Sequence, residues 1–131
     1  MYWIIYEVCY NLSRDVMKET KIKVCTSLNN IEENNEFLAV INEFLIKYID
    51  LENNKMTIDM KNNIIIRENR DYLFTMDFNY SKISILMKKL NKEFVKDIKT
   101  IVISRTSSKY LVRYLLVDEN IINEYYVKFL K

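Results

Sequence analysis

The arrangement of side chains that comes nearest to a catalytic site is Asp50 together with Asp59 and Lys61. Metal-dependent nucleases often hold Mg²⁺ with carboxylates on adjoining strands and keep a lysine near the attacking water. The acid-x-lysine pattern recurs at Glu19–Lys21 and Asp97–Lys99, however, and a chain with this many charges contains roughly two such pairs by chance. A magnesium-dependent nuclease is therefore only the third functional hypothesis.

Residue types that are missing exclude most other catalytic sites. The chain of 131 residues contains no glycine, no proline and no histidine. Without glycine it cannot build a phosphate-binding loop, a dinucleotide-binding turn or a glycine-flanked nucleophile turn. Without histidine it lacks the commonest general base and metal ligand. We therefore expect a protein that is not an enzyme and that uses no metal and no cofactor.

The two cysteines, Cys9 and Cys25, are too few for a disulfide scaffold or a four-ligand zinc site. They are interpreted as reduced strand residues, with a disulfide between them as the alternative. The apolar stretch from Met1 to Tyr6 has no basic segment before it and no small-residue cleavage site after it. No apolar run approaches the ~18 residues of a membrane span, so the chain is predicted to be cytoplasmic.

Composition indicates one compact domain over residues 1–131, because half of the residues are hydrophobic and 29% are charged. Ile, Asn, Lys and Tyr abound, and their AT-rich codons indicate an AT-rich genome, such as that of a virus, a phage or another mobile element. Since there is no glycine, we expect asparagine to take backbone positions with positive φ. Asparagine pairs occur at 29–30, 34–35, 53–54 and 62–63.

Two segments have the apolar spacing of amphipathic helices. In Tyr80 to Lys99, apolar residues recur at helical spacing and lysines fall on the opposite face. In Ile31 to Leu51, the apolar face is wider than one buried surface requires, and acidic residues gather opposite it. A stripe this wide suits burial from two sides or contact with a second copy of the chain, so a homodimer is among the predictions.

The remaining segments alternate between apolar and polar residues as strands do. The expected fold is therefore α+β, in the order ββ-α-βββ-α-ββ(β), with two amphipathic helices packed on one side of a mostly antiparallel sheet. A terminal helix from Asp118 is the alternative to the last strand. The predicted strand segments are Tyr2–Tyr10, which contains Glu7, Glu19–Thr26, a three-stranded meander over Lys55–Asn79, a hairpin of Thr100–Arg105 and Lys109–Val117, and Asn123–Leu130.

The leading functional hypothesis is a small non-enzymatic protein that acts by binding another protein, such as a host or defence factor that it inhibits. It rests on the absence of catalytic motifs, on the acidic face of the segment 31–51 and on the many tyrosines, a residue enriched at binding surfaces. The candidate protein-binding residues are Glu32, Glu36, Glu43 and Tyr48.

An uneven distribution of charge supports the alternative of a nucleic-acid-binding module. Residues 80–131 carry 11 Lys and Arg against 5 Asp and Glu, whereas residues 1–79 carry 9 against 13. Basic side chains with interleaved tyrosines suit phosphate neutralisation and base stacking. The candidate residues are Lys88, Lys89, Lys92, Lys96, Arg105 and Arg113.

Overall fold

The computed structural model describes residues 17–130, and every regular element in this part of the chain is a β-strand. Each strand pairs antiparallel with the next along the sequence, and the last pairs with the first. The ten strands are β1 (Lys18–Leu28), β2 (Ile31–Ile41), β3 (Leu45–Ile49), β4 (Lys55–Asp59), β5 (Ile64–Glu68), β6 (Tyr72–Asp77), β7 (Lys82–Met87), β8 (Lys92–Arg105), β9 (Lys109–Leu116) and β10 (Ile122–Leu130).

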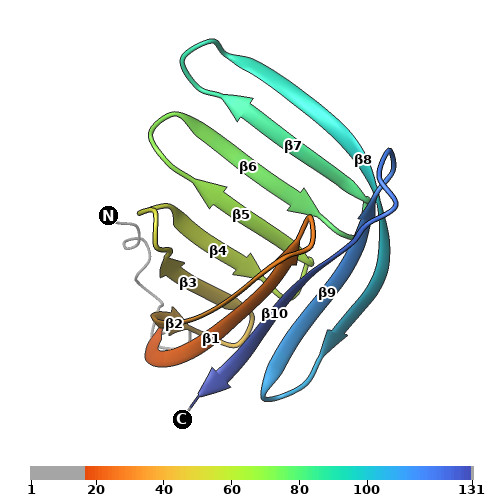
Figure 1. Ribbon diagram of the computed structural model, residues 1–131. Coiled ribbons are helices and arrows are strands. Elements are labelled where there is room, and N and C mark those ends of the chain that lie inside the picture. Colours follow the sequence, from red (N-terminus) through yellow and green to blue (C-terminus); the bar gives the residue numbers. More distant parts are fainter. Residues whose placement is uncertain (1–16, 131) are drawn as a thin grey trace.

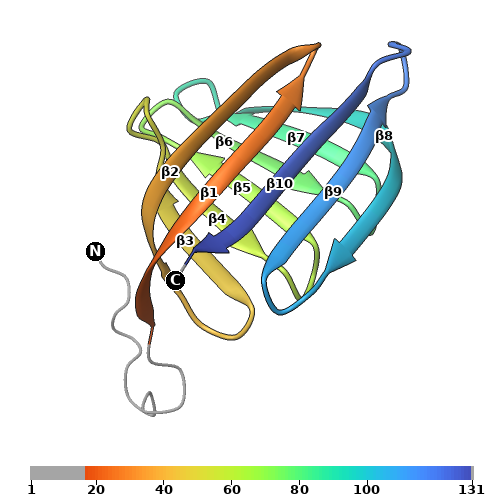
Figure 2. The same cartoon turned by 60° about the horizontal axis from the view of Figure 1, so that its bottom comes forward.

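The strands form a closed barrel of up-and-down topology. Figure 2 shows β2, β1, β10 and β9 in front, which we call the front sheet, and β3 to β7 behind them. The long, curved β8 runs along the side, and β3 to β8 together form the back sheet (Figures 1 and 2). Because side chains alternate between the two faces of a strand, every second residue points into the barrel.

The two ends of the barrel differ. Turns at 42–44, 60–63, 78–81 and 106–108 lie at one end, which we call the closed end, and the other turns lie at the open end. At the closed end the Arg105 guanidinium donates to the Glu43 carbonyl oxygen at 2.5 Å and lies over the Phe44 ring. Behind this contact the Tyr110 hydroxyl donates to Asn63 Oδ1 at 3.0 Å. These contacts seal the closed end over the core.

The core fills the half of the barrel that is nearer the closed end. Its apolar side chains come from all parts of the sequence, because alternate residues of neighbouring strands face the same interior. These side chains contact one another in the interior, so every part of the barrel wall buries apolar surface there. The largest fully buried side chains are Ile22, Ile46, Ile58, Ile65, Phe78, Tyr110, Val112 and Val127.

Asparagine takes the place of glycine in the turns, as the sequence predicts. Asn29 and Asn30 form the turn between β1 and β2 with φ of 52° and 67°. Asn53, Asn63 and Asn91 also have positive φ in turns. The pair 34–35 is an exception, because it lies within β2 and pairs with β1. Three of the four asparagine pairs therefore mark turns correctly.

The predicted helix Ile31–Leu51 is wrong. This segment is β2, a tight turn and β3. Phe37 and Ile41 face the interior from β2, and the turn shifts the phase so that Ile46 and Tyr48 face it from β3. Each strand alternates, and the short turn changes which residues face inward. As a result, the apolar residues of the whole segment recur at a spacing that resembles that of a helix. Asn42 builds the turn, since its Oδ1 accepts from the backbone N–H groups of Phe44 and Leu45.

The predicted basic helix Tyr80–Lys99 is wrong for the same reason. The segment is β7 and the first part of β8, joined by the turn at 88–91. Positive φ at Ser81 and Asn91 interrupts any helix there. The fold is therefore not α+β, and the apolar helical stripe on which the predicted homodimer rested does not exist.

Several strand predictions are confirmed. Glu19–Thr26 lies within β1, and Lys55–Asn79 contains the three-stranded meander β4 to β6. The hairpin after residue 100 is the end of β8 with β9, and the last segment is β10 rather than a helix. The predictions for Tyr2–Tyr10, with Glu7 and Cys9, lie outside the described residues. Among residues 17–130 there is no helix with the length and hydrophobicity that crossing a membrane requires.

We predict that Asn30→Gly leaves the free energy of unfolding unchanged or slightly higher, whereas Asn30→Ala lowers it by about 1 kcal/mol, because alanine pays the steric cost of positive φ. Urea denaturation of both variants measures the difference. Asn120→Ala is the control, since Asn120 is an exposed turn residue outside the positive-φ set. Equal stability of the two Asn30 variants would contradict the prediction.

Candidate functional site

The barrel is open on both sides near its open end. β2 pairs with β3 only through Val40 and Ile41, so the rest of β2 has no partner on that side. On the opposite side, β8 pairs with β9 only from Ile98 onward, so residues 92–97 have no partner there. The front and back sheets therefore separate toward the open end. We call the space between them the mouth.

One hollow of about 280 Å³ enters the mouth beside the gap between β2 and β3. We call it the Arg67 hollow. Its wall combines apolar, aromatic and charged side chains from both sheets, with acidic residues at the rim and Arg67 within. Its lining includes Leu28, Glu33, Tyr48, Asp50, Glu52, Arg67 and Tyr125.

Arg67 is the least satisfied polar side chain in the described part of the barrel. It points inward from β5, next to Met56 of β4 and Phe74 of β6. Its Nε is buried and has no hydrogen-bond partner, and its guanidinium makes no ion pair among residues 17–130. The guanidinium carbon lies 5.8 Å from the centre of the Phe74 ring, within the range of a cation–π contact.

Two buried tyrosines connect the sheets across the floor of the mouth. The hydroxyl groups of Tyr48 on β3 and Tyr125 on β10 form a hydrogen bond with each other. Burial raises the pKa of Tyr48 to about 12, and burial likewise raises the pKa of Tyr125, while the positive charge of Arg67 opposes both shifts. Burial also raises the pKa of Tyr114 to about 12. These phenols remain protonated at neutral pH.

A second hollow of about 450 Å³ enters the mouth beside the gap between β8 and β9. We call it the Phe94 groove. Its wall is mostly apolar and includes Phe74, Ile83, Ile85, Phe94, Tyr114 and Leu116. Leu28 borders both hollows, and Phe74, which contacts Arg67, lies in the wall of the groove. The two hollows are therefore neighbours that share Leu28 in their walls, and the Arg67–Phe74 contact links a residue of one hollow to a residue of the other.

Hydrogen bonds brace the rim of each sheet separately. In the back sheet, the Asp50 carboxylate accepts from the backbone N–H of Glu52 and from both the backbone and the side chain of Asn54. Asn54 Oδ1 then accepts from Asn69 at 2.9 Å. In the front sheet, the buried Asn123 accepts from the backbone N–H of Asn29 at 2.9 Å. Each side of the mouth is therefore held in shape on its own.

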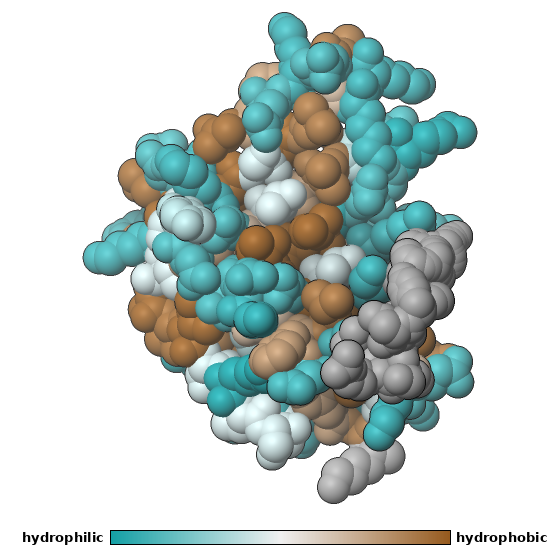
Figure 3. Space-filling view, turned by 180° about the vertical axis from the view of Figure 1, so that it is seen from behind, coloured by the Kyte–Doolittle hydropathy of each residue, from teal (hydrophilic) through white to brown (hydrophobic). Residues whose placement is uncertain are grey.

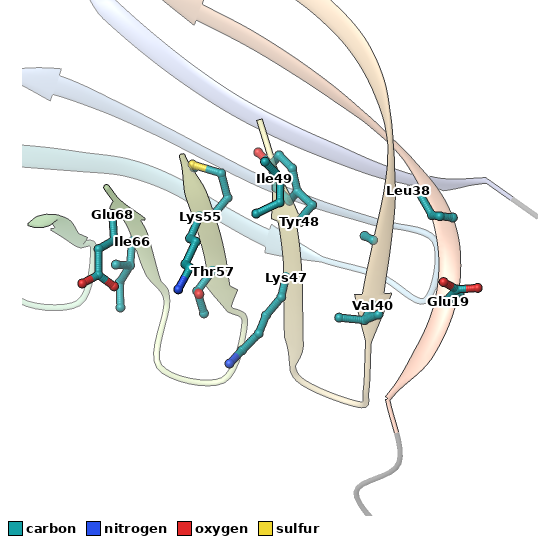
Figure 4. A pocket seen from close by; sticks show the side chains of 12 residues that line it. Glu19, Leu38, Val40, Lys47, Tyr48, Ile49, Lys55, Thr57, Ile66 and Glu68 are labelled. Carbon is teal, nitrogen blue, oxygen red and sulfur yellow. The ribbon is translucent and has the colours of Figure 1, made fainter. Parts of the chain in front are cut away.

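A third hollow lies on the outer surface, across β1 to β5, and has a volume of about 490 Å³. Figure 4 shows Lys47 and Lys55 within it, and Glu19 and Glu68 at its opposite margins. Burial, followed by the charge of Lys55, lowers the pKa of Lys47. Two cations and two carboxylates balance in this outer hollow, so it has no charge preference as clear as that of Arg67.

Hydrophobic side chains are also exposed on the outer surface. Figure 3 shows them gathered on the face opposite the view of Figure 1, bordered by hydrophilic side chains. Leu90 (66%) and Val95 (57%) are strongly exposed on the β7–β8 hairpin, as is Phe94 (57%), which faces the Phe94 groove. Phe94 and Val95 lie on the part of β8 that has no partner strand on one side.

The predicted protein-binding residues do not form one surface. Glu32 and Glu36 are exposed on β2, and Glu43 lies in a turn at the closed end. Tyr48 is buried inside the barrel, with 6% of its surface exposed. The acidic helix face that grouped these residues does not exist, and only Tyr48 lies at the mouth.

The predicted nucleic-acid-binding residues are divided among three regions. Lys88, Lys89, Lys92 and Lys96 lie in or near the turn between β7 and β8, where Lys88 pairs with Glu68 at 2.7 Å. Arg105 lies at the closed end, where its guanidinium contacts the turn between β2 and β3. Arg113 lies on β9 and pairs with Glu124 at 2.7 Å.

The carboxylates of the nuclease hypothesis have structural partners. Asp50 braces the rim of the mouth, as described above. The Asp59 carboxylate accepts from the backbone N–H groups of Lys61 and Asn62 in the turn after β4. Within residues 17–130, no group of three or more His, Cys, Asp or Glu side chains is placed to hold a metal ion.

Sequence reasoning missed Arg67, Tyr114 and Tyr125, and it named Tyr48 only as a protein-binding residue on a helix that does not exist. The segment Ile64–Glu68 reads IIIRE, so both faces of the strand carry isoleucine and neither is marked as interior. The one signal in the sequence was that Arg67 lies two residues after Ile65 and so shares its strand face. The structure shows that Ile65 is fully buried. Only the pairing of β5 with β4 and β6 shows that this face points inward.

Comparison with protein-family models, curated proteins and solved structures finds no match to this chain. No relative therefore carries a function to it or supports the predicted viral or mobile-element origin.

We predict that Arg67→Met leaves the free energy of unfolding unchanged or raises it by up to about 2 kcal/mol, because it removes a buried donor without a partner and keeps the volume of the side chain. Chemical denaturation measures this difference. The control Arg113→Met removes an exposed ion pair and should lower stability by less than about 1 kcal/mol. If Arg67→Met lowered stability by more than about 1 kcal/mol, the guanidinium would be a structural element.

We predict that stability falls as the pH rises from about 10 toward 12, because the tyrosines of the unfolded chain ionise near pH 10 while Tyr48 and Tyr114 ionise near 12 in the folded protein. Between these values the folded state binds more protons, so a rise in pH favours unfolding. Tyrosinate absorbance and denaturation across this range measure both effects. Tyr48→Phe should make the alkaline loss of stability shallower; an unchanged slope would refute the assignment.

Proposed function

We propose that this chain is a non-catalytic binding protein that holds a small amphipathic molecule in the mouth of its barrel. One observation carries the proposal: the Arg67 hollow and the Phe94 groove share Leu28 in their walls, and Arg67 of the first contacts Phe74 of the second. We propose that this polar end with one cation and the neighbouring apolar groove bind one ligand together. We propose that the protein works in the cytoplasm, as its sequence predicts.

The dimensions of the mouth suit a small ligand. Small-molecule sites typically have volumes of roughly 300–1,000 Å³ and combine apolar walls with a few polar groups. The hollows of about 280 and 450 Å³ are of this order. An apolar tail that fills the Phe94 groove would remove the surfaces of Ile85, Phe94 and Leu116 from water, which is favourable in proportion to the area covered.

The polar groups of the mouth are suited to binding rather than to proton transfer. Tyr48, Tyr114 and Tyr125 have raised pKa values, so near neutral pH they donate hydrogen bonds and do not act as bases. Arg67 remains a cation at every physiological pH. These residues can position a ligand without changing it, which supports a carrier or sensor rather than an enzyme.

Binding of a neutral environment-sensitive dye, Nile red, tests this proposal. We expect saturable 1:1 binding with blue-shifted emission. Leu28→Trp places a larger side chain where the two hollows meet and should weaken dye binding at least fivefold. Circular dichroism and thermal unfolding establish that the variant is folded.

Leu38→Trp is the matched control, because it makes the same change at the outer hollow, where Leu38 is 66% exposed. Dye binding should be unchanged in this variant. Loss of binding in Leu38→Trp with retention in Leu28→Trp would place the ligand in the outer hollow and contradict the proposal. Absence of saturable binding to the wild-type protein would contradict it as well.

Protein binding is a second candidate function, because β8 has an unpaired edge. Ile98 donates its backbone N–H to the Ser81 carbonyl oxygen of the turn before β7. Since hydrogen-bonding directions alternate along a strand, the N–H groups of Glu93, Val95 and Asp97 point toward the unpaired side. A strand of a partner protein could pair with this edge beside the exposed Phe94.

Val95→Pro distinguishes this candidate, because proline removes one outward N–H and leaves the bonds to β7 in place. A partner that binds the wild-type protein and Leu28→Trp but not Val95→Pro would support strand addition at β8. A partner that Val95→Pro binds equally well would exclude this edge.

A further inference from the structure

We infer that the ligand of the mouth carries an anionic head group, a carboxylate, that binds Arg67, with its apolar tail in the Phe94 groove. This inference rests on the proposed function and adds the chemical class of the ligand. It follows from three features of the mouth: an uncompensated guanidinium, a tyrosine hydroxyl with a proton to donate, and acidic residues that are either engaged or on the rim.

The guanidinium of Arg67 lacks the partners that arginine usually has when it is withdrawn from water. It lines the Arg67 hollow, its Nε is buried without a partner, and it makes no ion pair within the described part of the chain. A buried cation is costly unless it is paired. A carboxylate matches the planar fork of guanidinium donors and forms the strongest type of hydrogen-bonded pair.

The tyrosine pair on the floor supplies a second donor. Tyr48 and Tyr125 have one proton each on their hydroxyl groups, and their mutual hydrogen bond uses one of these protons. The other proton remains for a third acceptor. Tyr48, Tyr125 and Arg67 line the same hollow, so an oxygen anion beside the guanidinium shares that hollow with both hydroxyl groups.

The acidic residues of the same hollow make no ion pair with Arg67. Asp50 accepts three hydrogen bonds within the turn between β3 and β4, although its negative charge acts on Tyr48 and Tyr125 in the direction opposite to that of Arg67. Glu33 and Glu52 are exposed at the rim, where water and salt screen their charges. They oppose the entry of an anion only weakly, whereas Arg67 is partly buried within the hollow and its Nε is not exposed to water.

The tail direction follows from the shape of the mouth. From Arg67, the Phe74 ring and Leu28 lead into the Phe94 groove, whose wall is mostly apolar. The groove opens to solvent between β8 and β9, where residues 92–97 have no partner strand. A ligand with a flexible hydrocarbon tail can therefore extend from the head-group site toward this opening.

Three ligands with the same chain length test the inference: decanoate, decan-1-ol and decyltrimethylammonium, titrated calorimetrically into the full-length protein at pH 8. We expect decanoate to bind at least tenfold more tightly than the alcohol and the cation. Arg67→Met should reduce the affinity for decanoate to that for the alcohol and leave the alcohol within twofold. Arg67→Lys, which keeps the charge, should retain part of the preference.

Arg70→Met is the control, because it makes the same substitution at an exposed position in the turn between β5 and β6, at the rim of the same end. It should leave decanoate binding within about twofold. An equal loss in Arg70→Met and Arg67→Met would overturn the inference, since the effect would then be general electrostatic attraction.

The outcomes separate this inference from the proposed function. If the alcohol and decanoate bind equally and Arg67→Met changes neither, the mouth binds apolar molecules but the carboxylate inference is wrong. If the cation binds most tightly, the acidic rim selects the ligand and the inference is again wrong. If none of the three ligands and no Nile red binds, the proposed function fails as well.

Discussion

The structure depends on the fact that the two sheets of the barrel are hydrogen-bonded to each other mainly toward one end. On one side, Val40 and Ile41 provide the pairing of β2 with β3, and on the other, the pairing of β8 with β9 begins at Ile98. Toward the open end, β2 is not paired with β3 and β8 is not paired with β9. The two sheets can therefore separate there without breaking backbone hydrogen bonds between strands. The buried core, the mouth and its two entrances all follow from this difference between the ends.

Buried polar groups near the open end differ in whether they have hydrogen-bond partners. Asn54 and Asn123 are buried and hydrogen-bonded, and they hold the rims of the two sheets. Arg67 is partly buried, and its buried Nε has no such partner. Most buried polar groups in proteins are hydrogen-bonded, so an exception calls for an explanation, and a site that is completed by a ligand provides one.

The sequence allowed prediction of many strands and of most turns, but not of the fold class or the site. Alternation identified β1, β4 to β6, β9 and β10, and the asparagine pair at 29–30 marked the first hairpin. The two predicted helices failed because short turns join strands whose apolar residues happen to recur at helical spacing. Closure of β1 on β10 and the inward direction of Arg67 depend on pairings between strands, and single-strand patterns contain no information about these.

Closure of the ring has a consequence for how the chain folds. Nearly every strand pairs with its neighbour in sequence, so hairpins can form by closing short loops, whereas β1 must meet β10 across almost the whole described chain, as in the pairing of Lys21 with Leu130. Loop-closure entropy opposes that single contact most, and it is expected to form late. Among neighbouring strands of the ring, only β10 and β1 are not joined by a turn of the chain. A circular permutant that joins these strands and begins at the exposed turn after β8 would turn the slow, long-range closure into a local hairpin.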